Sequence, residues 1–487
     1  MNQACSADCS STHNWKLCVD AVVYIQHHRA TILSTSAPVY DYCCSWFTMG
    51  EAPKAEAAKS GPTKLAMFEV PLTAVEKMER TLDYAKDPEV YLRRKFGDKA
   101  FEKHKGMLAL EVKPDRDFYG KGAHKEYFER HIAQYMGRKH GLFFLTGVQA
   151  QLTAIKIHCE RAFNNRVAWH TTSHLENYEE KSYDVLYGLE RTLIGDDAER
   201  LPSIEDFKKV LDLPAEKRPA VILIEVPNRE IGCETYSFDE LKEICDACKS
   251  AGVVVHMDGA RLWEIEPYYR ATFQKCRKDL VRLFDSAYFS FYKGLGGITG
   301  AMLVSDDEIL IKEAKLWQRR AGGVSLTLMY EHIDSARGFN ECFGTFERRW
   351  KRLAEVAEAV KEATKGYRAP SGGRIVRFNP DKPKCCQVHL HFYGYTADQF
   401  KEARDKVQEK SNICIFDWLK TWKAVDEDQK KPIPMGEQVD HDIDGPPEKE
   451  HHSFEWVMID ATADLDTRVF VDAYVALCEE LTGKSKA

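Results

Sequence analysis

The residue best suited to covalent chemistry is Lys293, which lies between the apolar run Ala287–Tyr292 and the turn Gly294-Leu-Gly-Gly297. An isolated lysine is usually a solvated surface charge. A lysine between an apolar segment and a tight glycine turn is expected to be partly buried, and burial lowers the pKa of its amine. The position therefore predicts a usable nucleophile.

Four other polar groups follow short apolar segments in the same way. They are Thr146-Gly-Val148, His174, Glu225-Val-Pro-Asn228 and Asp258-Gly-Ala-Arg261. In an open α/β sheet, ligands bind beyond the carboxyl ends of the strands. A lone Asp after a strand often only caps the next helix. The whole set, and not Asp258 by itself, therefore indicates a site with an acid, an imidazole, a guanidinium and an amine.

The glycines after Lys293 also suggest a second interpretation. Gly294, Gly296 and Gly300 follow an apolar segment, as in a dinucleotide-binding loop. Such a loop must open a helix, so that the pyrophosphate meets the helix N-terminus. Here the following stretch, Gly300–Val304, has the pattern of a strand. We therefore favour a turn between two strands.

Short strands alternating with helices must position these residues. We expect helices at Tyr127–Met136, Ala150–Phe163 and Ser237–Ser250, and strands at Gly141–Leu145, Arg166–Trp169, Ala220–Glu225, Gly252–His256 and Ser286–Phe291. This alternation is typical of a mainly parallel α/β sheet between helices. It predicts a large domain over residues 117–340.

The remainder of the chain has a different pattern. Residues 1–65 are expected to be a mobile extension, because the stretch from Glu51 to Pro62 is small, polar and Pro-containing. Residues 66–116 form an N-terminal segment with a helix near Leu72–Lys86. Residues 341–487 are expected to be a small C-terminal α+β domain. Its expected elements are helices at Arg348–Lys365, Ala397–Gln408 and Thr467–Leu481, strands at Arg374–Phe378, Gln387–Phe392 and Trp456–Ile459, and a loop at Ala424–His452.

Composition excludes several classes of protein. The 487 residues are 44% hydrophobic with a formal net charge of -7, which argues for a globular interior and against nucleic-acid binding. No run of 18 apolar residues predicts a membrane span. The motif Cys245-Asp-Ala-Cys248 lacks a second pair at zinc spacing, so two buried thiols are favoured over a metal or redox role. Without a signal-peptide pattern, a cytoplasmic location is expected.

Several segments resemble one known family when taken in order. They are Asp117-Phe-Tyr-Gly120, Leu145-Thr-Gly-Val-Gln-Ala-Gln151, His256-Met-Asp-Gly-Ala-Arg261 and Ser290-Phe-Tyr-Lys-Gly-Leu-Gly-Gly297. The set is similar to the threonine aldolase / β-eliminating lyase family, whose enzymes have the type I pyridoxal-phosphate (PLP) fold. The similarity runs roughly from Asp117 to Gly323, with a weaker echo in the C-terminal domain.

The resemblance implies a role for each residue toward PLP. Lys293 forms the Schiff base, and Asp258 pairs with the pyridine nitrogen and keeps it protonated. His174 stacks on the ring and acts as an acid or base. The remaining residues bind phosphate, ring oxygen or substrate: Gly147 and Val148 through backbone N–H groups, Ser290 through its hydroxyl, and Arg261 and Tyr119 at the substrate. Tyr119 is supplied by a neighbouring subunit, which implies a homodimer or homotetramer.

The sequence departs from the family pattern in the substrate half of the site. Leu326 aligns where threonine aldolases carry a phosphate-binding Arg, and Met458 lies near the position of their carboxylate-binding Arg. The family's N-terminal Ser-Asp-Thr segment has no clear counterpart before Asp117. The candidates for a replacement cation are Arg374, Arg377 and Arg261. Arg374 and Arg377 are three apart, so at most one of them faces inward from a strand.

The function that these residues predict is retro-aldol cleavage of a β-hydroxy-α-amino acid to glycine and an aldehyde. β-Elimination and amino-acid racemisation use the same carbanion and remain alternatives. A catalytically silent scaffold is a third possibility, which the retention of Lys293, Asp258 and His174 in one chain disfavours.

Overall fold

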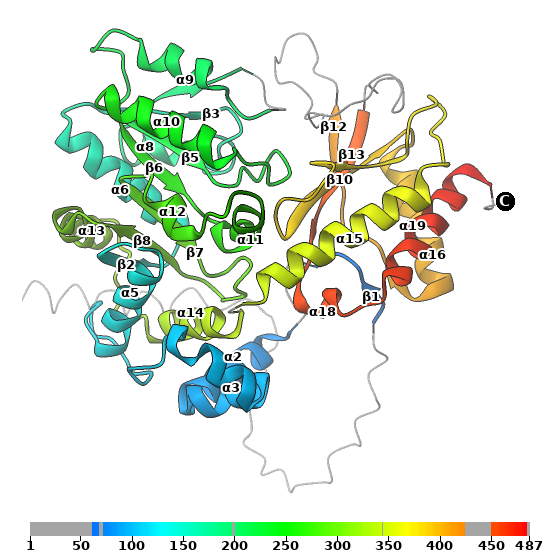
Figure 1. The fold of residues 1–487 in the computed structure, drawn as a ribbon, viewed down its shortest axis with the longest axis horizontal. Helices are drawn as coiled ribbons and strands as arrows, with labels where there is room; N and C mark the ends of the chain where they lie inside the picture. Colours follow the sequence, from blue (N-terminus) through cyan, green and yellow to red (C-terminus); the bar gives the residue numbers. More distant parts are fainter. Residues whose placement is uncertain (1–60, 68–71, 197–199, 343, 424–449, 485–487) are drawn as a thin grey trace, which may run out of the picture. The chain divides into compact units, whose positions relative to one another are not determined.

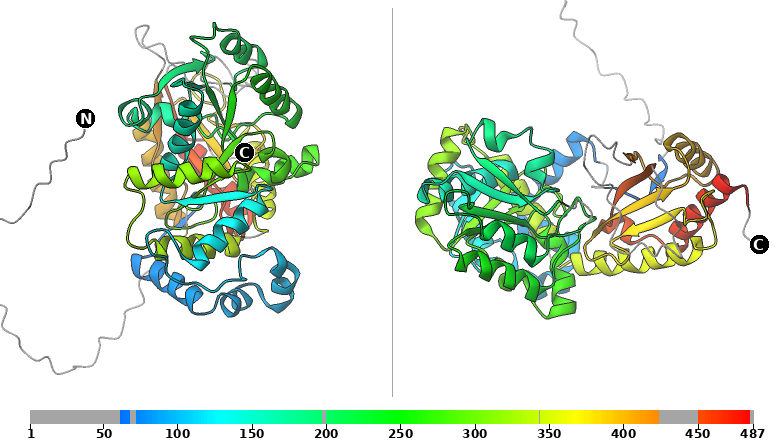
Figure 2. Two further views of the ribbon diagram at one scale, coloured as in Figure 1. Left: turned by 90° about the vertical axis from the view of Figure 1, so that its left-hand side faces the viewer. Right: turned by 90° about the horizontal axis from the view of Figure 1, so that it is seen from above.

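The structure is a computed structural model that describes residues 61–67, 72–196, 200–342, 344–423 and 450–484 (Figures 1 and 2). These residues belong to one compact unit that begins at Gly61. The extension predicted at residues 1–65 lies outside the described residues up to residue 60, as does most of the loop predicted at Ala424–His452. No helix in the described ranges combines the length and apolarity needed to cross a membrane.

A seven-stranded sheet in the order β2-β8-β7-β6-β5-β3-β4 forms the centre of the large domain. The strands are β2 (His140–Phe144), β3 (Arg166–His170), β4 (Glu190–Ile194), β5 (Val221–Glu225), β6 (Val254–Asp258), β7 (Ser286–Ser290) and β8 (Ala301–Ser305). β3 to β7 run parallel to one another, whereas β8 runs antiparallel to both β7 and β2. The mainly parallel sheet confirms the predicted fold class, and β8 confirms that the glycines after Lys293 connect two strands.

Helices cover both faces of this sheet (Figure 1). They are α5 (Ala123–Tyr135), α6 (Gly147–Arg161), α7 (His174–Asn177), α8 (Ser182–Val185), α9 (Ile204–Leu211), α10 (Phe238–Ser250), α11 (Leu262–Phe273), α12 (Arg277–Val281) and α13 (Glu308–Arg320). α10 begins with a capping box, in which the Glu240 N–H donates to Ser237 Oγ at 3.2 Å and the Ser237 N–H donates to Glu240 Oε2 at 2.8 Å.

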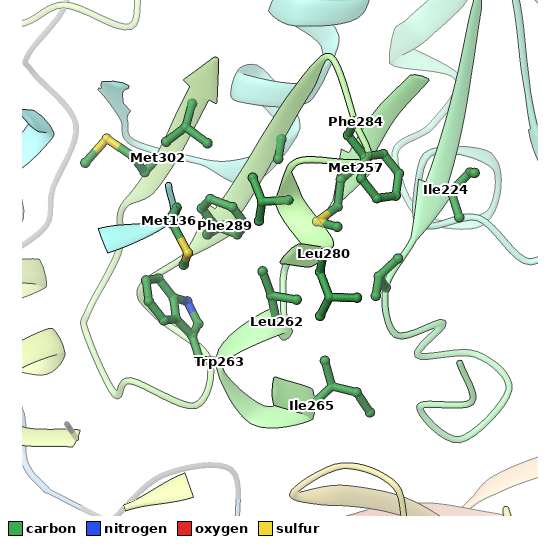
Figure 3. Close-up of a cluster of buried hydrophobic side chains, with 14 of the residues drawn as sticks. Met136, Ile224, Met257, Leu262, Trp263, Ile265, Leu280, Phe284, Phe289 and Met302 are labelled. Atoms are coloured by element: carbon green, nitrogen blue, oxygen red, sulfur yellow. The ribbon is translucent and has the colours of Figure 1, made fainter. Parts of the chain in front are cut away.

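Strand alternation divides the apolar side chains between two cores. Met257 and Phe289 point to the side covered by α11 and α12, where they meet Leu262 and Leu280 (Figure 3). Tyr288 points to the opposite side and packs with residues of α6 and α13. Each fully buried Leu, Phe or Met contributes about 1.5–3 kcal/mol. Both faces of the sheet are therefore fixed, and the strand ends are held in a constant arrangement.

The small domain is a four-stranded antiparallel sheet in the order β12-β13-β10-β9. Its strands are β9 (Val376–Asn379), β10 (Gln387–Tyr393), β12 (Lys420–Lys423) and β13 (Glu450–Val457), with helices α15 (Phe346–Thr364), α16 (Ala397–Ser411), α18 (Asp460–Ala463) and α19 (Thr467–Thr482). One face of this sheet is apolar, and its side chains Leu390, Phe454 and Trp456 form part of a separate hydrophobic core in the small domain. The other face carries buried polar side chains, among them His389 and Glu455.

The N-terminal segment packs on both domains. Its helices α2 (Ala74–Lys86), α3 (Pro88–Phe96) and α4 (Asp98–His104), followed by the 3-10 turn Lys105–Met107, lie against α14 (Met329–Cys342). Further upstream, β1 (Thr63–Lys64) pairs in parallel with β11 (Ile413–Cys414), and Leu65 is fully buried. Residues 63–65 are thus paired and packed, although the predicted boundary put them in the extension. The boundary predicted at residue 340 falls inside α14.

Most predicted elements agree with the structure to within a few residues, and two differences affect the site. β6 extends to Asp258 instead of ending at His256, so Asp258 is the last residue of a strand. β13 begins at Glu450, so His451 and His452 belong to a strand and not to the predicted loop. The first residues of β13, Glu450-His-His-Ser453, are all polar and were therefore not expected to form a strand, yet His451, His452 and Ser453 are buried in the strand.

Candidate active site

The candidate residues meet at the carboxyl edge of the large sheet because of strand register. Glu225, Asp258 and Tyr288 are paired across β5, β6 and β7. These strands are parallel, so all three chains leave the sheet at the same edge. Lys293 follows β7 by three residues and lies in the turn that leads to β8.

Asp258 and Glu225 form a buried pair of carboxyl groups. Asp258 Oδ1 accepts from the Ala260 N–H at 2.9 Å, and the side chain of Gln151 on α6 adds a second hydrogen bond. Burial raises the pKa of Asp258, while Lys293 opposes this rise. Burial and the neighbouring Asp258 raise the pKa of Glu225 to about 7. The charge of Asp258 therefore opposes ionisation of Glu225.

Lys293 has a pKa below its usual value, chiefly because of burial and then because of the Arg261 guanidinium. Hydrogen bonds to two different helices hold the turn that carries Lys293. The Gly294 N–H donates to Glu264 Oε1 at 3.2 Å, and the Gly294 carbonyl accepts from Arg349 Nη1 at 2.8 Å. A Cβ at Gly294 would lie 2.6 Å from Glu264 Cγ, so glycine is required there.

Arg261 is buried and paired inside the same cluster. Its Nη1 donates to Glu264 Oε1 at 2.8 Å, the oxygen that also receives the Gly294 N–H. Its Nε has no hydrogen-bond partner in the described part of the chain. Arg261 is therefore near enough to Lys293 to lower the pKa of its amine, and its own charge is paired with an acid of α11.

His174 begins the short helix α7 and is held from two sides. Its backbone N–H donates to Glu225 Oε1 at 2.6 Å, and its Nδ1 lies 2.9 Å from Glu179 Oε1. The Tyr178 ring lies against the imidazole with ring centroids 5.2 Å apart. Because Glu179 engages Nδ1, the other nitrogen, Nε2, is left for proton transfer.

The N-terminus of α6 adds a row of backbone N–H groups to the site. Thr146 caps the helix by accepting from the Gln149 N–H at 3.3 Å. The Gly147 N–H donates to the Tyr292 hydroxyl, which is also hydrogen-bonded to that of Tyr288. A Cβ at Gly147 would overlap the Tyr288 ring, so only glycine fits. Val148 is the next residue of the helix, and it packs against a buried cluster that includes Leu152 of α6 and Trp169 of β3. Sequence analysis missed Tyr292, although it directly precedes Lys293.

Two other predicted residues are engaged elsewhere. Ser290 is fully buried, and its hydroxyl donates to the Ala260 carbonyl at 3.0 Å, which ties the loop after Asp258 to β7. Tyr119 is 49% exposed and makes its contacts with Phe118, Arg319 and Leu326. The structure thus brings Tyr119 to Leu326, the position aligned with the family's phosphate-binding Arg, and leaves both side chains exposed.

Arg229 is the main residue that sequence analysis missed. It follows the Glu225-Val-Pro-Asn228 segment and forms an ion pair with Glu455 of β13. Its guanidinium lies 5.2 Å from the centroid of the Tyr178 ring, the ring that contacts His174. Arg229 also lowers the pKa of Lys293. The available signal was its position four residues after Glu225, the acid that ends β5.

Three residues were considered for the substrate-carboxylate site, and the structure gives the surroundings of each. Met458 is fully buried in the small-domain core, where its Sδ accepts from Thr462 Oγ1 at 3.4 Å, so it does not line the site. Arg374 precedes β9 instead of lying within the predicted strand. The Arg377 guanidinium lies 4.0 Å from the centroid of the Tyr393 ring. Glu455 is the β13 residue that reaches the segment after β5.

The CxxC motif is part of the hydrophobic core. Cys245 and Cys248 are fully buried on the inner face of α10, and burial raises the pKa of the Cys248 thiol to about 12. A search of the described residues finds no group of three or more His, Cys, Asp or Glu side chains that could hold a metal ion.

The observed residues fit a PLP cofactor. A buried carboxylate, Asp258, has a raised pKa and lacks a full cationic partner, which a protonated pyridine nitrogen would supply. Lys293 supplies an amine of lowered pKa for the aldehyde carbon. The N-terminus of the 15-residue helix α6 is a favourable place for a phosphate. Each part of the cofactor thus finds a chemically matched group.

Comparison with known proteins agrees with this class of site. Residues 104–330 match the model of the β-eliminating lyase family. The fold is that of the type I PLP-dependent enzymes. A solved protein of Listeria monocytogenes, provisionally named an L-allo-threonine aldolase, has a TM-score of 0.66 and 28% identity, and the alignment covers 86% of this chain and 97% of that one.

Two curated relatives are similar over the same region. An alanine racemase of Cochliobolus carbonum is 28% identical over 198 residues, which cover 40% of this chain and 49% of the relative. A low-specificity L-threonine aldolase of Arabidopsis thaliana is 24% identical over 221 residues, covering 45% and 60%. The match to the racemase spans about half of that relative's length. Over residues 104–330, the chain is thus similar to the β-eliminating lyase family and to proteins named threonine aldolases.

Proposed function

We propose that the protein is a PLP-dependent lyase that cleaves a β-hydroxy-α-amino acid into glycine and an aldehyde. The observation that carries the proposal is the grouping of Lys293, Asp258 and His174 at one strand edge. An amine of lowered pKa, a buried carboxylate and an imidazole with a carboxylate partner are the groups that this reaction needs. The named threonine aldolases among the relatives support the same reaction.

Lys293 and Asp258 hold the cofactor and set its charge. Burial and two nearby guanidinium groups favour the neutral amine of Lys293, which is the form that attacks an aldehyde. Asp258, with donors from Ala260 and Gln151, would carry the negative charge of the carboxyl pair and would keep a proton on the pyridine nitrogen of the bound cofactor. When bound, the cofactor supplies a conjugated ring that accepts the electron pair of the broken Cα–Cβ bond.

His174 is the base that we assign to the β-hydroxyl group of the substrate. Glu179 holds Nδ1 and stabilises the charge that the imidazole gains when Nε2 accepts the hydroxyl proton. Loss of that proton and cleavage of the Cα–Cβ bond release the aldehyde. The proton held on His174 Nε2 then returns to the α-carbon, which gives glycine and restores the neutral imidazole.

Arg229 is the cation that we assign to the substrate α-carboxylate. It lies close enough to Lys293 to lower the lysine pKa, and it contacts the ring beside His174. Arg261, the other nearby guanidinium, is buried against Glu264 and has less freedom to turn toward a ligand. A planar guanidinium binds a carboxylate in a bidentate manner. Glu455 would keep Arg229 oriented between turnovers.

Racemisation is the second candidate, because one relative is named an alanine racemase. The two reactions differ in the bond that breaks at the α-carbon. To separate them, the cofactor-loaded protein is incubated with threonine, with phenylserine and with each enantiomer of alanine. We expect glycine and benzaldehyde from phenylserine, and a weaker reaction of threonine. Interconversion of the alanine enantiomers without aldehyde from either hydroxy amino acid would contradict the aldolase assignment, and Lys293→Ala controls for reaction in solution.

A further inference from the structure

A cavity of about 130 Å³ opens beside Lys293 on the side of the N-terminal segment. The turn Gly294–Ile298 forms one wall, helices α2 and α3 form another, and α14 and α15 close it. Residues Ile459 and Asp460, directly after β13, complete the lining. Figure 1 shows α2 and α3 next to α14, and α15 running from that region to the small sheet. The cavity therefore joins the proposed nucleophile to three separate parts of the chain.

The charged residues that line this cavity are mainly basic. They are six basic side chains, Lys77, Arg80, Lys95, Lys293, Arg337 and Arg349, and two acidic ones, Glu341 and Asp460. Basic groups concentrated around a partly open cavity raise the local potential and attract an anion, because solvent screens them less than on an open surface.

The two acidic side chains of the lining already have cationic partners within the protein. Glu341 is fully buried and accepts from Arg80, from Tyr91 and from Lys95 Nζ at 2.7 Å, while Arg337 Nη1 lies 3.2 Å from it. These cations hold the pKa of Glu341 at about 2, so it stays negative at any working pH. Arg337 is also paired with Asp334 of α14, with Nε 2.7 Å from Oδ1, so two carboxylates face the three cations Arg80, Lys95 and Arg337.

Asp460 is shared in the same way by Arg348 and Arg349. Arg349 keeps an unsatisfied donor, because its Nε is buried without a hydrogen-bond partner in the described part of the chain. The side chains of Arg80 and Lys95 remain 30% and 39% exposed. Donors thus remain on several sides of the cavity.

From this geometry we infer that the cavity binds a second acidic group of the amino-acid substrate, so that the preferred substrates carry a carboxylate on the side chain. Lys293 is itself part of the lining, and we therefore place the acidic side chain of a ligand linked at its amine in this cavity. The volume suits a carboxylate with one or two methylene groups. This inference rests on the proposed function for the covalent site, but it concerns binding and not cleavage.

The test uses ligands of equal size that differ in charge. The cofactor-loaded protein is titrated with aspartate and with asparagine, as both enantiomers, and the change in the cofactor absorbance band gives each Kd. We expect aspartate to bind about tenfold more tightly, since a charge-assisted hydrogen bond exceeds a neutral one by about 1.4 kcal/mol. Cleavage is not required, so failure of the aldolase reaction leaves this test intact.

Arg80→Gln is the informative variant. It removes a cation from the cavity, while Glu341 keeps Lys95, Arg337 and Tyr91 as partners, so the fold should persist. We expect the preference for aspartate to fall to about threefold or less, with the Kd of asparagine unchanged, and Arg80→Lys to restore part of it. Arg94→Gln is the control, because Arg94 lies on the same helix, α3, as Lys95, but outside the lining.

Two results would overturn the inference. Equal Kd values for aspartate and asparagine in the wild-type protein would show that no second acid is recognised. An equal loss of affinity for aspartate, asparagine and alanine in Arg80→Gln would show that the cavity takes the α-carboxylate instead. A cofactor-free arm measures succinate against succinamide by calorimetry. Binding of succinate alone, lost in Arg80→Gln, is expected, and failure of succinate to bind would contradict the inference independently of the cofactor.

Discussion

Glu225 and Asp258 are register partners at the ends of two neighbouring parallel strands, β5 and β6. Both carboxyl groups are buried at the site, and both have raised pKa values. Their surroundings distinguish them. Asp258 receives hydrogen bonds from Ala260 and Gln151, while Glu225 accepts the backbone N–H of His174. We therefore expect Asp258 to be the ionised acid of the loaded site and Glu225 to be protonated.

This difference predicts opposite results for two isosteric substitutions. Asp258→Asn removes the charge partner of the pyridine nitrogen, and turnover should fall roughly a thousandfold or more if the charge pair supplies about 4 kcal/mol. Glu225→Gln keeps a neutral group of the same shape and should retain cofactor binding and most of the turnover. Steady-state kinetics and the cofactor absorbance band measure both. A near-normal Asn variant would rule out this role for Asp258.

The pair also predicts a pH dependence of the cofactor-free protein. The folded-state pKa of Glu225 is about 7, above its usual 4.5. The folded state therefore binds more protons than the unfolded state between these values, and this contribution to stability falls as the pH rises from about 4.5 to 7. In urea unfolding, Glu225→Gln should show a smaller loss of stability over that range. An unchanged slope would contradict the buried, protonated state of Glu225.

Glu341 predicts the opposite pH dependence. Its folded-state pKa of about 2 lies below the usual 4.5, so its contribution is fully present above pH 4.5 and is lost as the pH falls toward 2. The shift corresponds to about 3 kcal/mol. Glu341→Gln should therefore lower the free energy of unfolding at pH 7, by an amount that shrinks in acid. Glu331→Gln on the same helix, α14, is the control, and an equal effect in both variants would argue against the ion-pair cluster.

Arg229 should determine how well the substrate α-carboxylate binds. In Arg229→Gln, we expect the Kd of an amino acid to rise about tenfold or more, because a charge-assisted hydrogen bond is lost. The Kd of the matching amine without a carboxylate should change little. Arg377→Gln is the control, since Arg377 lies over Tyr393. An equal change for the amino acid and the amine would assign Arg229 a purely structural role.

Some of these positions were predictable from the sequence, and others were not. Lys293, Asp258 and Glu225 each lie at or just after the end of a short apolar strand. Such a pattern is local in the sequence, so the sequence alone can predict it. The ion pair between Arg229 and Glu455 joins segments far apart in the chain, so no local pattern reports it. The first residues of β13 are polar although they are buried, so no change in polarity marked the start of the strand. The direction of the Met458 side chain was therefore not predictable. The hydrogen bond from the Ser290 hydroxyl to the Ala260 carbonyl also joins two distant segments, and the contact of Ser290 with the cofactor stays a prediction.

The central claim is that Lys293 forms the covalent link to PLP, and chemical reduction tests it most directly. The purified protein, loaded with the cofactor, is treated with borohydride, digested and mapped by mass spectrometry. We predict loss of the visible absorbance band and a pyridoxyl group on the peptide that contains Lys293, with neither in Lys293→Ala. A pyridoxyl group on another lysine, or a band that survives reduction, would contradict the assignment of this site.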